Sequence, residues 1–198
     1  MMLLAFVFIL MHAVSSFLNV DDRLKLELDR RKLLFQKAFE SRFDTGANRS
    51  IALFPGKGEV QVITFSSSLL FEQGKWDLKP AGRQQLLKLA PLLKEFLSRD
   101  NGFKEIRVCG HTNSDPFLTW DPRCPTNWHL SSLRATAVVF LLGNLVGFRN
   151  LSAVGFADNR PYRPGEKTLL DKESQKRIEI ELYYSKDWIE EVSRGSDS

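Results

Sequence analysis

The stretch Arg107 to Pro116, RVCGHTNSDP, contains side chains that are common in metal, catalytic and ligand-binding sites. Cys109 and His111 are potential metal ligands, and Cys124 and His129 follow further along the chain. Thiolate sulfur and imidazole nitrogen are the ligands that zinc prefers in structural sites. Their spacing, however, matches no familiar zinc finger, and a glycine separates Cys109 from His111 at the end of an expected strand. We therefore expect no metal and no cofactor here.

A nucleophile with a neighbouring base is a second interpretation. Ser131, Ser132 or Cys124 would attack, and His111 or His129 would accept the proton. The chain has no GxSxG elbow, and no Asp is placed to orient either histidine. A serine at the start of a helix usually caps it. These observations favour a binding protein over an enzyme.

A third interpretation is a pocket for a small zwitterionic group. Asn113 and Asp115 lie in the turn after the expected strand, and Arg134 lies in the helix that follows. A guanidinium binds a carboxylate through two parallel hydrogen bonds, and an Asp accepts hydrogen bonds from an ammonium group. The amide groups at the helix N-terminus favour an anion as well. Alternatively, Arg134 is an ordinary solvated helix residue.

Two cysteines, Cys109 and Cys124, are present in the chain. In an oxidising compartment they can form one disulfide that closes the 110–123 loop, and in a reducing one they are small apolar residues. The residues alone leave both possibilities open, and we take Cys109–Cys124 as a disulfide candidate.

The hydrophobic pattern predicts the elements that position these side chains. Alternation predicts strands at 59–65, 104–110, 151–157 and 176–184. Helical spacing predicts a helix over 79–99, bent at Pro91, and a second over 130–147, with Ser131 as N-cap and Gly147 as the C-terminal stop. This order implies an α/β (α+β) fold, in which a mixed sheet has both helices on one face. The 110–128 and 156–175 loops then meet at one sheet end.

The first 20 residues differ from the rest because they contain no charged residue. A run of this length is just enough for a transmembrane helix. A cleaved secretory signal is the alternative, but no basic segment precedes the apolar run. Residues 22–43 follow as an amphipathic helix, and a linker rich in turn residues extends to 58. The net charge of +4 is spread along the chain, so we expect no nucleic-acid binding.

Four segments carry a family resemblance: IRVCGHTNSDP, NWHLSSLRATAVVFLL, VGFADNRP and KRIEIEL. In this order and at these distances they resemble the OmpA/MotB-like peptidoglycan-binding domain, and LLFEQGKWDLKPAGRQQLLKLAPLL resembles that family's upstream motif. The resemblance covers about residues 59–184. It implies a βαβαββ fold and non-covalent binding of the diaminopimelate residue in peptidoglycan stem peptides.

Carried over residue by residue, the resemblance implies a set of ligand-binding positions. Arg134 matches the family's Arg, and Asn127 matches its Asn. The family's Asp falls on Asn113, which loses the charge-assisted part of a hydrogen bond to an ammonium group, although Asp115 is close enough in sequence to supply the charge. The ligand-binding residues implied are Thr112, Asn113, Asp115, Asn127, Leu130, Arg134 and Arg177.

The apolar N-terminus is similar to the single transmembrane helix of MotB-type stator subunits. The resemblance implies an inner-membrane homodimer with a periplasmic domain and a MotA-like multi-span partner. In that family an ion-binding Asp lies just before the position of Met1, so either the start is truncated or the chain conducts no ions. A structural wall-linking protein and a wall-anchored motor of anti-phage defence are the alternatives. We expect an anchor at 1–20, an amphipathic helix and linker at 21–58, the binding domain at 59–184 and a tail at 185–198.

Overall fold

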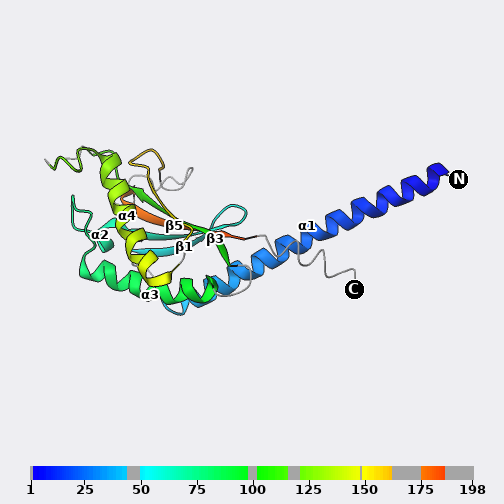
Figure 1. The fold of residues 1–198 in the computed structure, drawn as a ribbon, viewed down its shortest axis with the longest axis horizontal. Helices are drawn as coiled ribbons and strands as arrows, with labels where there is room; N and C mark the ends of the chain where they lie inside the picture. Colours follow the sequence, from blue (N-terminus) through cyan, green and yellow to red (C-terminus); the bar gives the residue numbers. More distant parts are fainter. Residues whose placement is uncertain are drawn as a thin grey trace.

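The fold combines one sheet, one layer of helices and a long N-terminal helix (Figure 1). The computed structural model describes residues 2–43, 50–97, 102–115, 121–147, 149–161 and 175–185. The strands are β1 (Ile51–Pro55), β2 (Val60–Ser66), β3 (Phe103–His111), β4 (Leu151–Gly155) and β5 (Arg177–Tyr184). The helices are α1 (Met2–Glu40), α2 (Ser67–Leu70), α3 (Pro80–Leu97) and α4 (Asn127–Val146).

The sheet has the order β1-β2-β5-β3-β4, with β3 and β4 parallel and the other neighbours antiparallel. Alternate residues of the central strands, such as Ile63, Val108 and Ile180, are fully buried and share one core with α3 and α4. The opposite face of β3 presents Arg107 and Cys109, as the alternating pattern predicts. The predicted mixed sheet with both helices on one face is confirmed.

Two local predictions differ from the structure. β1 lies within the segment expected to be a linker, and it pairs with β2 along its whole length. Helix α4 begins at Asn127, and Thr126 rather than Ser131 is its N-cap. The predicted C-terminal stop is confirmed, because Gly147 adopts the left-handed conformation that glycine tolerates best. Helix α3 continues through Pro91.

Helix α1 is continuous from Met2 to Glu40 and ends inside the domain. Phe35, Phe39 and Phe43 are at most 2% exposed and belong to the same core as the sheet. Phe35 packs edge-to-face against Phe96 of α3 and Phe103 of β3. The end of α1 is therefore part of the domain core, and the amphipathic pattern of 22–43 reflects this packing.

The part of the chain that the structure describes contains one helix long and apolar enough to cross a membrane by composition, α4. Almost half of its apolar window is buried against the rest of the domain, as expected for a core helix. Most side chains of residues 1–20, the predicted anchor, lie outside the described residues, as does the tail beyond 185.

The packing of the end of α1 in the domain core gives a first prediction. Replacing Phe39 with alanine is expected to lower the free energy of unfolding by about 3–5 kcal/mol, because the side chain is fully buried and stacks on Phe43. Urea unfolding followed by tryptophan fluorescence measures this change. The control is Leu34→Ala on the outer side of the same helix, where the side chain is 41% exposed. Equal, small losses for both variants would contradict the seating of α1 in the core.

Candidate functional site

The candidate site lies at the end of the sheet where β3 and β4 finish and α4 begins. The Thr112 amide donates to the Ala157 carbonyl at 2.8 Å, and the Phe156 amide donates to the Gly110 carbonyl at 2.9 Å. The Ala157 amide donates in turn to Oγ of Ser131 in α4 at 3.1 Å. These bonds join the segments after β3 and β4 to the first turns of α4, so the predicted clustering of loops at one sheet end is confirmed.

Two glycines allow α4 to approach the strands closely. A Cβ atom at Gly110 would lie 2.0 Å from the Ser131 carbonyl oxygen, and one at Gly155 would lie 2.2 Å from Oγ of Ser132. Both distances are far below van der Waals contact. The glycines of the GHT and VGF segments are therefore required by the packing of α4 on the ends of β3 and β4.

Asn127, in the first turn of α4, fixes the turn that follows β3. Its Nδ2 donates to the Asp115 carbonyl oxygen at 2.9 Å and to the Asn113 carbonyl oxygen at 3.3 Å. Within that turn, Nδ2 of Asn113 donates to Oδ2 of Asp115 at 2.6 Å. The carboxylate of Asp115, which is exposed, thus lies directly beside the position where the family pattern has its acid.

Arg134 lies two turns further along α4 and is only 4% exposed. Its Nε donates to the Lys75 carbonyl at 2.8 Å, its Nη1 to Oγ of Ser67 at 2.9 Å and its Nη2 to the Glu72 carbonyl at 3.4 Å. Within the described residues no carboxylate forms an ion pair with it. Burial lowers the pKa of Arg134 to about 10, so the guanidinium still carries its charge at neutral pH.

The remaining predicted ligand residues lie at the same sheet end but are enclosed. Leu130 is 4% exposed, and Thr112 is 3% exposed with a buried hydroxyl that lacks a hydrogen-bond partner among the described residues. Arg177 begins β5 on the face away from the helices, where its Nε donates to Oε1 of Glu179 at 2.7 Å. Its Nη2 donates to the Arg160 carbonyl at 3.1 Å, so Arg177 holds the loop after β4.

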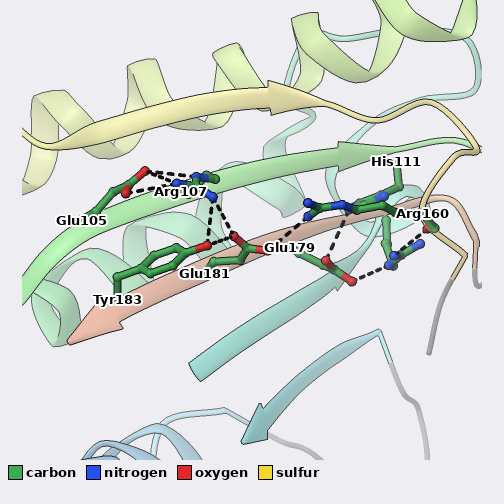
Figure 2. Close-up of polar contacts among 8 residues, drawn as sticks. Glu105, Arg107, His111, Arg160, Glu179, Glu181 and Tyr183 are labelled. Atoms are coloured by element: carbon green, nitrogen blue, oxygen red, sulfur yellow. Dashed lines mark hydrogen bonds and ion pairs between the residues drawn. The ribbon is translucent and has the colours of Figure 1, made fainter. Parts of the chain in front are cut away.

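The open face of the sheet carries a ladder of paired charges that sequence reasoning missed (Figure 2). Arg107 donates to both carboxylate oxygens of Glu105 and to the hydroxyl of Tyr183. That hydroxyl donates to Glu181 at 2.7 Å. Charged residues alternate along RVCGH and RIEIEL, and their cross-strand register brings Arg107 opposite Glu181. The positive and negative side chains of this ladder therefore neutralise one another.

His111 continues this ladder toward the candidate site. Its ring is buried and stacks on Phe156 with 5.4 Å between ring centroids. Its Nε2 lies 3.3 Å from Oε2 of Glu179, without the geometry of a hydrogen bond. Burial lowers the pKa of His111, and Arg177 and Arg160 lower it further, against the opposing effect of Glu179.

The disulfide candidate Cys109–Cys124 is wrong, because both cysteines are free thiols in the structure. Cys109 points to the open face of the sheet, near Glu179 and Glu181, whereas Cys124 lies near Arg134 on the helix side. Burial raises the pKa of both thiols. The same separation keeps Cys124 apart from Cys109 and His111. The four side chains considered above as zinc ligands therefore do not form one site.

The candidate nucleophiles are engaged with the main chain. The hydroxyls of Ser131 and Ser132 both donate to the Trp128 carbonyl, at 3.0 and 2.8 Å. Nδ1 of His129 lies 2.8 Å from Oγ1 of Thr126, the N-cap residue. The serines and this histidine thus shape the start of α4.

The buried pair of His111 and Glu179 predicts a loss of stability in acid. Burial alone would raise the pKa of Glu179, but His111 and Arg177 lower it to about 2, so its contribution is lost as the pH falls from 4.5 toward 2. His111 binds its proton more weakly when folded than its ordinary value of 6.5, so its contribution is lost below pH 6.5. The melting temperature is therefore expected to fall between pH 7 and pH 5.

His111→Gln is expected to reduce this difference between pH 7 and pH 5, because it removes a side chain whose pKa is lowered from its ordinary value by burial in the folded chain. Scanning fluorimetry at the two pH values measures it. His129→Gln is the control, since His129 is exposed, and it is expected to retain the wild-type difference. An unchanged difference in His111→Gln would assign the acid sensitivity to another group.

A family model described as the OmpA family matches residues 70–178, more than half of the chain. The chain belongs to the OmpA family. This OmpA-family chain is also 30% identical over 127 residues to YtxE of Bacillus subtilis strain 168. The match covers 63% of this chain and 49% of that relative, so the chain spans about half the length of the curated relative it matches.

Solved structures share the fold of this OmpA-family chain at low sequence identity. A putative MotB-like protein from Desulfovibrio vulgaris has a TM-score of 0.66 and 20% identity, covering 82% of this chain and 98% of its own. The cell wall anchor of the T6SS from Pseudomonas aeruginosa has a TM-score of 0.59 and 23% identity, covering 76% and 95%. The periplasmic domain of Helicobacter pylori MotB has a TM-score of 0.56 and 19% identity, covering 74% and 90%.

Proposed function

We propose that this OmpA-family chain binds peptidoglycan non-covalently through Arg134. The observation that carries the proposal is the charge of Arg134, which is almost fully buried and, among the described residues, donates hydrogen bonds to neutral acceptors. A buried charge without a counter-ion is costly, and an anionic ligand that pairs with it removes this cost. Two of the structural relatives are a cell wall anchor and a MotB periplasmic domain, which supports a ligand from the wall.

The proposed ligand group is the zwitterionic end of a diaminopimelate residue in the stem peptide. Its carboxylate would bind Arg134, and its ammonium group would bind Asp115. Side chains seven positions apart, like Asn127 and Arg134, lie on nearly the same face of a helix, and helical side chains lean toward the helix N-terminus. Arg134 and Asn127 would then present their side chains to the same ligand. The amide of Asn113 holds the carboxylate of Asp115 beside this turn, which would replace the missing family acid.

The chain would act as an anchor rather than an enzyme, as a single-pass inner-membrane protein with its domain in the periplasm. Phe6, Phe8 and Met11 near the start of α1 are exposed apolar side chains, 66%, 72% and 68% accessible, which supports contact with lipid. We further propose the role of a B-type subunit of an ion-driven stator, as a homodimer beside a MotA-like multi-span protein. The MotB-like relatives support this role.

Sedimentation with purified sacculi tests the wall-binding function. The full chain, solubilised in a mild detergent, is expected to pellet with sacculi that contain diaminopimelate and to be released by excess free stem peptide. Sacculi whose stem peptides contain lysine are the matched control, since lysine lacks the second carboxylate. Equal pelleting with both wall types, or none with either, would contradict the proposed ligand.

A further inference from the structure

Helix α2 and the turn after it line the guanidinium of Arg134. We call Ser67, Phe71, Glu72 and Lys75 the arginine cradle. Ser67 and the carbonyls of Glu72 and Lys75 accept hydrogen bonds from three different nitrogens of the guanidinium. The ring of Phe71 lies 5.1 Å from the guanidinium carbon and covers its face. The arginine cradle therefore restrains the plane and the rotation of the charged group.

Ser67 is the member of the arginine cradle whose side chain accepts a hydrogen bond from Arg134. It is 4% exposed, and its hydroxyl lies 2.9 Å from Nη1. Its main chain is fixed independently, because its amide donates to the Lys176 carbonyl and its carbonyl accepts from the Phe71 amide. Replacing this hydroxyl would remove a contact to Arg134 while leaving the backbone bonds of α2 in place.

The bonds to the arginine cradle leave a defined set of donors for a ligand. A guanidinium has five N–H groups, and the cradle takes one from each nitrogen. Among the described residues this leaves one N–H on each terminal nitrogen, and two parallel N–H groups of a guanidinium bind the two oxygens of a carboxylate. A group held in place before binding loses less entropy when the ligand arrives.

We propose that Ser67 is a positioning residue for anion binding by Arg134, an inference that rests on the proposed function. Ser67→Ala is expected to weaken binding to diaminopimelate-containing sacculi about tenfold, the value of one hydrogen bond to a charged group. Sedimentation of the detergent-solubilised full chain over a range of sacculus concentrations measures this. In the ligand-free protein, the same variant is expected to shift the NMR signal of the Arg134 Nε–H group, identified by its absence in Arg134→Ala.

The matched control is Ser68→Ala, which removes the hydroxyl of the next, exposed residue of α2. It is expected to leave both the affinity and the Arg134 signal unchanged. If the wild type binds and Ser67→Ala binds within twofold of it, or leaves the Nε–H signal in place, the positioning role is overturned while the proposed function stands. If the wild type itself fails to bind, the proposed function fails and the positioning role with it.

Discussion

Replacing Arg134 with alanine is expected to reduce retention on diaminopimelate-containing sacculi by about 100-fold or more. The estimate follows from losing one partner of an enclosed, hydrogen-bonded charge pair, which costs about 2–5 kcal/mol in binding. The expected effect is large because Arg134 is 4% exposed, and a charge pair shielded from water interacts more strongly than one in bulk solvent. Sedimentation of the full chain with increasing amounts of sacculi gives the change in affinity directly.

The matched control for this prediction is Arg83→Ala on the exposed side of α3. It removes the same formal charge from a solvated position, so it is expected to change the affinity less than twofold at physiological salt. A second variant, Arg134→Lys, keeps the charge but loses the planar fork, and it is expected to recover only part of the binding. Equal retention of wild type and Arg134→Ala would exclude Arg134 as the anion-binding group.

Gly110→Ala is expected to have the largest effect on stability, a loss of about 3 kcal/mol or more. The added methyl group would lie 2.0 Å from the Ser131 carbonyl oxygen, so α4 must move away from β3. Both groups belong to the main chain of regular elements, and neither can relax by rotating a side chain. Urea unfolding of the variant, followed by tryptophan fluorescence, measures the loss.

Gly143→Ala provides the contrast for Gly110→Ala. Gly143 lies within α4, and an added Cβ would be 3.4 Å from Cδ1 of Leu151, an ordinary contact. Alanine is a better helix former than glycine by about 1 kcal/mol, so this variant is expected to be as stable as wild type or more stable. Wild-type stability of Gly110→Ala would show that α4 does not pack on the end of β3 as described.

The sheet and the two long domain helices could be predicted because burial imposes period 2 on strands and period 3.6 on helices. The strand β1 was missed for a physical reason: it lies at the sheet edge, five residues long, next to turn residues. The sequence predicts too late a start for α4 because a serine near the beginning of an apolar helix resembles an N-cap. In the structure the Ser131 hydroxyl instead accepts a hydrogen bond from the Ala157 amide, which belongs to another segment. Such a tertiary contact leaves no local pattern in the sequence.

For the site, sequence reasoning proposed residues but not the contacts that hold them. Asn127 and the 113–115 turn come together at one sheet end as expected from the order of the motifs, whereas Arg134 bonds to the 67–75 segment. The carbonyls of Glu72 and Lys75 that hold Arg134 could not be found, because any residue type supplies a main-chain acceptor. The disulfide prediction failed because spacing along the chain does not reveal that the two cysteines face opposite sides of the sheet.

The seating of α1 determines how a mechanical force would cross the domain. Helix α1 meets the end of the sheet that carries Phe103 and Tyr184, where Gln61 donates to the Lys32 carbonyl and bonds to Tyr184. The candidate site lies at the other end, away from the start of α1 (Figure 1). Under the proposed function, tension between a membrane anchor and a wall ligand would therefore run lengthwise along β3 and β5. Both strands would then be loaded along their length rather than across it, so the load does not peel their cross-strand hydrogen bonds open one at a time.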